Sequence, residues 1–145
     1  MEPNFEAVLN ILGRKRVRPG EPMSLHTTYK IGGPADLFFE AQTAQDIMQA
    51  ILIAREQQIP YFLLGLGANI LVGDRGIRGL VIKNRYQTIE FLSGNFLLAG
   101  SGAVMDEIIK KTAAESLSGL EHFIGIPSTV GGAVWQNLHF LSPDR

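Results

Sequence analysis

The chain has 145 residues, of which 46% are hydrophobic and 19% charged, and its formal net charge is -1. A chain of this length can bury a core, but it lacks the concentrated basic face that nucleic-acid binding requires. The absence of cysteine excludes disulfide bonds, thiolate metal sites and cysteine nucleophiles.

The first predicted elements are a short helix and an extended segment. Apolar residues at helical spacing predict a helix over residues 4–12, which Gly13 ends and which would suit an N-terminal flap. Two prolines and a glycine make residues 18–22 an extended connector, and the Gly-Gly-Pro sequence at residues 32–34 predicts a turn.

A strand and a helix come next, followed by two further strands. Residues 37–41 predict the strand and residues 43–58 the helix, which Thr43 and Asp46 are placed to cap. Because a helix lies between the strands, we expect parallel pairing. Two continuous apolar runs predict the buried strands of this sheet, namely residues 61–64 and 80–82.

The second half of the chain has a different pattern. A Ser93-Gly94 turn between residues 88–92 and 95–99 predicts an antiparallel hairpin. Apolar residues at helical spacing then predict a helix over residues 103–117. Residues 119–145 contain a glycine-rich loop and a short apolar stretch with no regular element.

A first glycine-rich loop, GLGANI at residues 65–70, follows a predicted strand. Its glycines permit positive φ angles that turn successive amide N–H groups toward one point, an arrangement that binds phosphate. Ile70 stands where the dinucleotide fingerprint needs a third glycine, and the loop lacks the Lys-Ser or Lys-Thr end of a Walker loop. By spacing alone, the loop is either a phosphate nest or a tight turn.

A second glycine-rich loop occupies residues 125–133 and combines a proline, two hydroxyl residues and a glycine pair. Its small residues would let the backbone approach a flat ring or a pyrophosphate. On spacing alone, a tight turn is the interpretation that the same composition favours.

Four sequence blocks stand in a specific order: HTTYKIGGPAD from His26, LGLGANILV from Leu64, GIRGLVI from Gly76, and a last block made of GLE from Gly119 and GIPSTVGGAV from Gly125. In this order they resemble the UDP-N-acetylenolpyruvoylglucosamine reductase family over about residues 20–137. They are similar more loosely to FAD domains of the vanillyl-alcohol-oxidase type.

The resemblance implies an α+β fold in which two lobes hold FAD. This is the two-lobed FAD-binding domain of the vanillyl-alcohol-oxidase/p-cresol-methylhydroxylase type, with the second lobe incomplete. We expect an N-terminal helix and connector over residues 1–19, the first lobe over 20–84 and the start of the second over 85–145, without the substrate domain.

The resemblance also implies the cofactors, FAD with NADPH as electron donor. The first loop would cradle the FAD pyrophosphate, with Asn69 fixing the loop or reaching a phosphate, and the second would lie along the cofactor. The implied cofactor-binding residues are Gly65, Leu66, Gly67, Ala68, Asn69, Ile70, Ser128, Thr129, Gly131 and Gly132.

The family passes hydride from NADPH through FAD to UDP-N-acetylglucosamine enolpyruvate, giving UDP-N-acetylmuramate for peptidoglycan synthesis. Its catalytic arginine, serine and glutamate have no counterpart here, so we assign no catalytic residue and expect the chain to be inactive alone. Ser128 also replaces the family's usual glycine, and the bulkier NLHFLS at residues 137–142 replaces a small-residue stretch. We therefore expect a fragment, a degenerate homologue or a split protein whose second chain supplies the missing lobe.

Two other functions stay open: an FAD-linked oxidase or dehydrogenase of another small molecule, and a non-catalytic flavin-binding module. We expect a UDP-sugar partner in the full-length enzyme, no nucleic-acid or membrane partner, and a cytoplasmic location, since no signal peptide or spanning segment is visible. Isolated histidines predict no metal site. Arg78 reads as part of a solvated turn, and Trp135 and Phe140 read as core aromatic residues.

Overall fold

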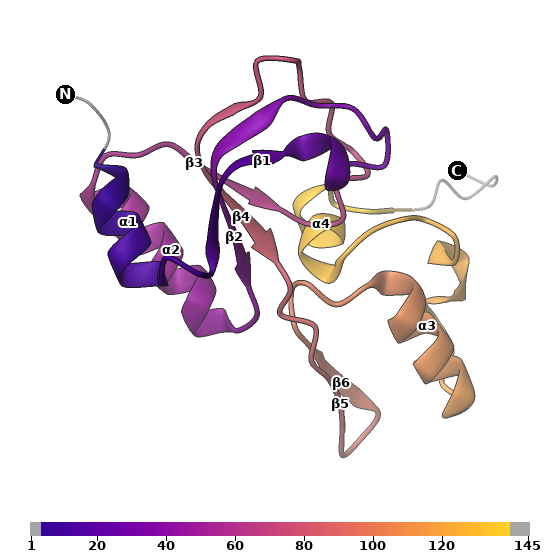
Figure 1. Ribbon diagram of the computed structural model, residues 1–145. Helices are drawn as coiled ribbons and strands as arrows, with labels where there is room; N and C mark the ends of the chain where they lie inside the picture. The colour runs from indigo at the N-terminus through magenta and orange to yellow at the C-terminus, as the bar shows by residue number, and fades with distance from the viewer. Residues whose placement is uncertain (1–3, 140–145) are drawn as a thin grey trace. The chain divides into compact units, whose positions relative to one another are not determined.

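The computed structural model describes residues 4–139 and divides into two units, Met1–Arg85 and Tyr86–Arg145 (Figure 1). The first unit holds a four-stranded sheet, and the second holds a two-stranded hairpin with helices. Within the described residues, no helix combines the length and apolar character needed to cross a membrane.

Helix α1, Phe5–Leu12, begins the first unit where the sequence predicts it. Asn4 accepts a hydrogen bond from the amide of Ala7, and Gly13 ends the helix with a φ of 89°. Val8 and Leu12 are buried in the same core as sheet residues. The expectation of an N-terminal flap is therefore wrong, because this helix is part of the core.

The segment expected to be a connector is a strand at the edge of the sheet. Strand β1, Val17–Pro22, pairs antiparallel with β2, Pro34–Ala41. Proline cannot donate to the strand ladder, but an edge strand leaves one side unpaired and tolerates it. The prolines and glycine that suggested a connector are therefore compatible with pairing on one side.

The remaining strands pair in parallel, as predicted. Strand β4, Ile77–Asn84, lies between β2 and β3, Tyr61–Leu64, giving the order β1-β2-β4-β3. Helix α2, Ala44–Glu56, connects β2 to β3 and begins with the predicted capping box. The Thr43 hydroxyl oxygen accepts from the Asp46 amide at 3.0 Å, and the Asp46 carboxylate accepts from the Thr43 amide at 3.2 Å.

Burial differs between the two apolar strands. Leu80 and Ile82 of β4 are 0% exposed, as predicted for a buried strand. Phe62 and Leu63 of β3 are 39% and 47% exposed, so the prediction that residues 61–64 are buried is wrong except at Leu64. The reason is that β3 lies at the edge of the sheet and β4 in its interior.

The sheet has a separate core on each face. Leu37, Phe39 and Ile82 pack with α1 and α2, which lie on the same side of the sheet in Figure 1. Because successive strand residues point to opposite faces, Phe38 and Val81 belong to the second core. A short 3-10 helix, Met23–Leu25, and the glycine-rich loop after β3 contribute to that second core.

The hairpin of the second unit consists of β5, Ile89–Leu92, and β6, Phe96–Ala99, and agrees with the prediction. Helix α3, Met105–Ala114, is shorter than the predicted range of residues 103–117 but buries its predicted apolar face. Two short helices that were not predicted follow, η2 at Glu121–Phe123 and α4 at Val130–Trp135.

Candidate functional site

The first glycine-rich loop starts at the carboxyl end of β3 and leads to the amino end of β4. Because β3 and β4 are parallel, the chain must return along the sheet between them. Ile70 and Val72 of this return segment pack in the second core with Met23 and Phe38. The loop is therefore built on a buried face of the sheet.

Gly67 fixes this loop against the backbone of residues 26–28. Its φ is 78°, and an added Cβ would lie 2.1 Å from the carbonyl oxygen of His26. The amide of Thr28 donates to the Gly67 carbonyl oxygen at 3.1 Å. Positive φ is found at Gly67 and not at Gly65, so one glycine of the pair makes the turn.

The amide groups of this loop are without an intramolecular acceptor. Among the described residues, none of the six N–H groups of residues 65–70 donates a hydrogen bond. Gly67 is buried, and buried amides are almost always paired. Successive free N–H groups are the donors that anion-binding nests use. The loop therefore fits a phosphate group.

The second glycine-rich loop uses most of its amides internally. The amide of Gly131 donates to the Ser101 carbonyl oxygen at 2.7 Å, and that of Val130 to the Ala103 carbonyl oxygen at 2.9 Å. The amide of Gly132 donates to the Thr129 hydroxyl oxygen at 3.1 Å, which caps α4. Gly131 and Gly132, which the resemblance places along the cofactor, thus also stabilise the start of α4 through their amides.

Ser128 and Thr129 keep free amides at the start of this helix. Within residues 4–139, neither N–H group donates a hydrogen bond. The Ser128 hydroxyl donates to the Thr129 carbonyl oxygen at 3.0 Å, and Thr129 is 3% exposed. The second segment therefore offers two backbone donors where the first offers six.

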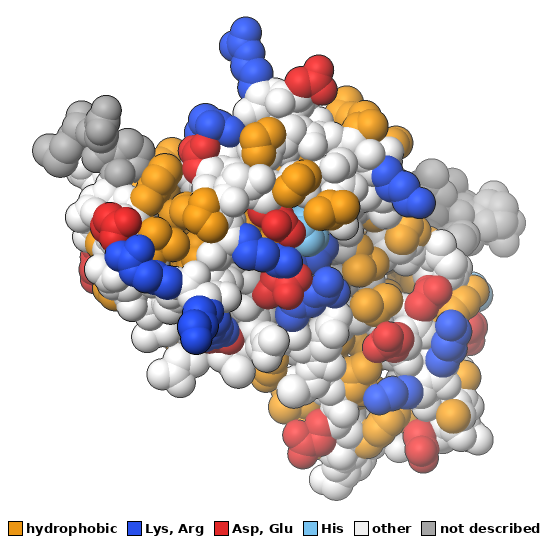
Figure 2. All heavy atoms as spheres, viewed as in Figure 1, with side chains coloured by type: hydrophobic (Ala, Val, Ile, Leu, Met, Phe, Trp, Pro, Cys, Tyr) orange, Lys and Arg blue, Asp and Glu red, His pale blue; other side chains and the backbone are white. Residues whose placement is uncertain are grey.

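Charged side chains gather on the sheet face that the first loop covers. His26 stacks on Phe38 with ring centroids 4.1 Å apart, and its Nε2 lies 2.9 Å from a carboxylate oxygen of Glu21. The Arg18 guanidinium lies 4.8 Å from the Phe38 ring centroid and 3.4 Å from a carboxylate oxygen of Glu40. Figure 2 shows basic and acidic side chains side by side over this part of the sheet.

Lys83 is a buried cation on this same face. It lies at the carboxyl end of β4, in register with Glu40 and Leu64, and is 5% exposed. Burial and, to a smaller extent, the positive charge of Arg85 lower the pKa of Lys83 to about 8, while the Glu40 carboxylate opposes the shift. Sequence reasoning missed Lys83, because a lysine at the end of a strand normally reaches solvent.

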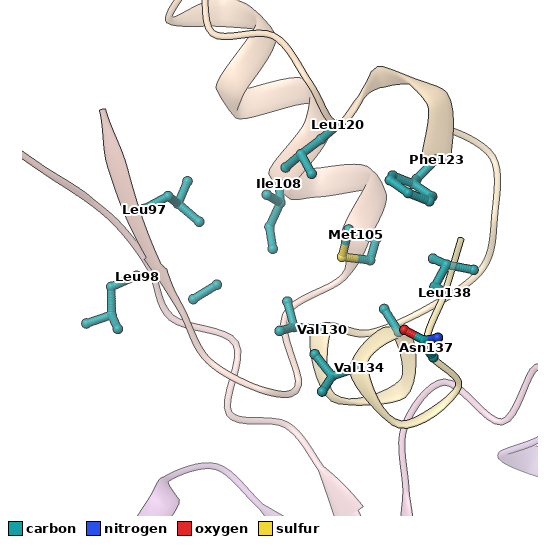
Figure 3. A pocket seen from close by; sticks show the side chains of 12 residues that line it. Leu97, Leu98, Met105, Ile108, Leu120, Phe123, Val130, Val134, Asn137 and Leu138 are labelled. Atoms are coloured by element: carbon teal, nitrogen blue, oxygen red, sulfur yellow. The ribbon is translucent and has the colours of Figure 1, made fainter. Parts of the chain in front are cut away.

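The second unit contains an apolar cavity of about 650 Å³ that the sequence did not predict. Strand β6 and helices α3, η2 and α4 line it, with Leu97, Ile108, Phe123 and Val134 among the contributing side chains (Figure 3). Asn137 is the one polar side chain of the lining. This cavity therefore suits an apolar group and offers no acid or base.

Several other residues have no place in a site. Trp135 is 86% exposed, so its expected role in the core is wrong, because it ends a short helix whose described residues are not fully buried. Arg78 lies in strand β4 and not in the predicted turn, because β4 begins at Ile77; its exposed side chain pairs with Asp36 and donates to the carbonyl oxygens of Pro34 and Arg75. Phe140 and the rest of residues 140–142 lie outside the described residues.

The described part of the chain contains no cluster of His, Asp or Glu suited to a metal.

Comparison with known proteins shows a family. The model of a family described as FAD binding domain matches residues 35–141. The UDP-N-acetylenolpyruvoylglucosamine reductase of Alkaliphilus oremlandii (strain OhILAs) is 39% identical over 135 residues, which is 92% of this chain and 44% of that protein. The chain thus spans less than half the length of the curated relatives it matches.

Solved structures agree with this result. The crystal structure of UDP-N-acetylenolpyruvylglucosamine reductase from Thermus caldophilus matches with a TM-score of 0.63 and 35% identity, over 78% of this chain and 39% of that chain. The structure of p-cresol methylhydroxylase with substrate bound matches with a TM-score of 0.53 and 17% identity, over 77% of this chain and 24% of that one, and shows the fold alone. The predicted α+β fold class and the resemblance drawn from the four sequence blocks are confirmed.

Proposed function

The chain belongs to the family of FAD binding domains, and from this premise we propose that it is the FAD-binding part of an NADPH-dependent reductase that converts UDP-N-acetylglucosamine enolpyruvate to UDP-N-acetylmuramate. The observation that carries the proposal is the run of free amides at residues 66–69, since it supplies the donors that a pyrophosphate needs. The identity to reductases of this reaction supports the choice of substrate.

We propose one cofactor-binding backbone segment in each unit. The first is residues 65–70, in which Gly67 sets the turn and the following N–H groups donate to the pyrophosphate. The second includes Ser128 and Thr129, whose amides are free, and Gly131 and Gly132, whose lack of side chains lets a ligand approach the first turn of α4. Backbone donors of this kind bind without a charged side chain and are already in place before the ligand arrives.

FAD, when bound, supplies the redox chemistry of the proposed reaction, and the protein supplies binding and orientation. We assign no catalytic residue to this chain. NADPH as donor, a UDP-sugar as substrate, peptidoglycan precursor synthesis and a cytoplasmic location are parts of the same proposal, and they belong to the longer protein that the relatives represent.

Retention of FAD is the first test. The purified chain is mixed with FAD, the excess is removed, and the absorption spectrum is recorded; we expect about one flavin per chain, because the free amides provide a preformed anion site. Replacing Ala68 by proline removes one of the free N–H groups of the loop, so A68P should weaken FAD binding about tenfold, while the control A68G keeps the N–H group. Failure of both the chain and its whole reading frame to retain FAD would contradict the proposal.

Substrate is the second test. In the protein encoded by the whole reading frame, NADPH should bleach the flavin bands, and the enolpyruvyl sugar nucleotide should restore them. Bleaching by a different small molecule, and not by NADPH, would favour an oxidase or dehydrogenase instead. A bound flavin that no donor reduces would favour a non-catalytic flavin-binding module.

A further inference from the structure

Lys83 is a buried cation that lacks a direct partner among the described residues. It is 5% exposed, and within that part of the chain its ammonium group makes no hydrogen bond and no ion pair. The neighbouring carboxylate of Glu40 is already engaged by Arg18 at 3.4 Å and by Arg85 at 3.7 Å. The side chain is enclosed while its nitrogen keeps contact with solvent, since no fully buried side-chain nitrogen of the described residues lacks a hydrogen-bond partner. The ammonium group is therefore open to a negative group that is not part of the chain.

The position of Lys83 leads to the first loop. Its register partner on β3 is Leu64, the residue that directly precedes the loop. Lys83 lies two positions beyond Val81, so its side chain shares the sheet face of the second core. That core includes Leu64 and also Ile70 from the far end of the loop. The ammonium group therefore lies on the face along which the loop runs.

The contacts of Gly67 reinforce this placement. Gly67 lies against the carbonyl group of His26, and the His26 ring stacks on Phe38. Phe38 pairs in register with Val81, two residues before Lys83. Gly67 and Lys83 are thus both connected to the face of the sheet that carries the second core.

Resting on the proposed function, we propose that the Lys83 ammonium binds a phosphate oxygen of the FAD pyrophosphate, together with the free amides of residues 66–69. The amides supply neutral donors, and Lys83 supplies the charge that balances the anion. The phosphate is in turn the ion-pair partner that the Lys83 ammonium lacks among the described residues. The lowered pKa of Lys83 in the free chain is consistent with this absence of an anion.

The test compares flavins with and without phosphate. Dissociation constants of FAD and of riboflavin are measured by flavin fluorescence for the wild-type chain and for K83M, K83R and K15M. Lys15 is an exposed lysine of the same unit, so K15M removes the same charge away from the site. We expect K83M to weaken FAD binding about tenfold or more and to leave riboflavin unchanged, because a charge-assisted hydrogen bond to phosphate is lost. K83R, which keeps the charge, should recover much of the affinity, and K15M should bind both flavins like the wild type.

A measurement on the wild-type chain covers the case in which K83M does not fold. The pKa of Lys83 is followed by the chemical shift of its Cε carbon, without ligand and with each flavin. FAD should raise this pKa and riboflavin should not, because a bound anion favours the charged ammonium.

Each failure has its own meaning. If K83M binds FAD within about twofold of the wild type, or loses riboflavin equally, the assignment of Lys83 is overturned while FAD binding by the wild type leaves the proposed function standing. An unchanged Lys83 pKa in the FAD complex would overturn it as well. A wild-type chain that binds neither flavin would overturn the proposed function and the assignment with it.

Discussion

The two glycine-rich segments use their backbone in different ways. In residues 65–70, none of the six N–H groups has an intramolecular acceptor among the described residues, and Gly67 is present because the backbone of His26 leaves no room for a side chain. In the second segment, the amides of Val130, Gly131 and Gly132 are all engaged within the unit. Glycine content alone therefore does not identify a phosphate nest, whereas the pairing of the amides separates a nest from a helix start.

The largest expected effect is at the glycine of the first loop. G67A would place a Cβ 2.1 Å from the His26 carbonyl oxygen at a positive φ of 78°, so we expect it to lower the free energy of unfolding by about 3 kcal/mol or more and to abolish FAD retention. Urea denaturation measures the first effect and the absorption spectrum the second.

A matched control for this change is available in the same unit. Gly20 has a similar φ of 67° with nothing within 4 Å of an added Cβ. G20A should cost about 1 kcal/mol, from backbone strain alone. Equal losses for the two variants would show that contact with His26 does not set the shape of the loop.

The lowered pKa of Lys83 predicts that the stability of the chain depends on pH. The pKa of Lys83 is lowered from 10.5 to about 8 in the folded chain, mainly by burial, so the unfolded state binds more protons between these values and stability should rise with pH through that window. Without FAD, the wild type should gain up to about 3 kcal/mol relative to K83M between pH 8 and pH 10.5.

Denaturation of both proteins across this pH range measures the difference. The comparison with K83M removes the contribution of every other titrating group. Parallel curves for the two proteins would contradict a buried, unpaired Lys83.

In the second segment, the capping side chain of Thr129 should matter more to stability than the hydroxyl of Ser128. T129A removes the oxygen that accepts from the Gly132 amide, so we expect a loss of about 1 kcal/mol in the stability of the second unit. T129S keeps this oxygen and serves as the control. A T129A variant as stable as T129S would mean that α4 does not depend on its cap.

The smallest effect is expected at Ser128. Its hydroxyl donates only to the carbonyl oxygen of the next residue, so S128G, which introduces the residue usual in the resembling family, should change stability by about 0.5 kcal/mol or less. FAD affinity should stay within about twofold, because the proposed donor is the backbone amide, which glycine retains. A larger loss of affinity would assign the cofactor contact to the hydroxyl group.

Local chemistry made several elements predictable. The capping box of α2 and the helix stop at Gly13 depend on residues within a few positions of each other, so the sequence contains the whole interaction. The hairpin around Ser93 and Gly94 is predictable for the same reason. The four ordered sequence blocks likewise identified the family, because each block is a contiguous run of residues.

The sequence by itself thus determined the local elements, the family and the place of the two loops. Only the tertiary structure decided that β1 is a paired strand, that β3 lies at an edge while β4 is buried, and that α4 forms at a glycine pair. It also decided that Lys83 is buried and that the amides of Val130, Gly131 and Gly132 are occupied. The physical reason is that strand order, burial and hydrogen-bond partners depend on residues far apart in the chain, whereas capping and turn formation depend on neighbours.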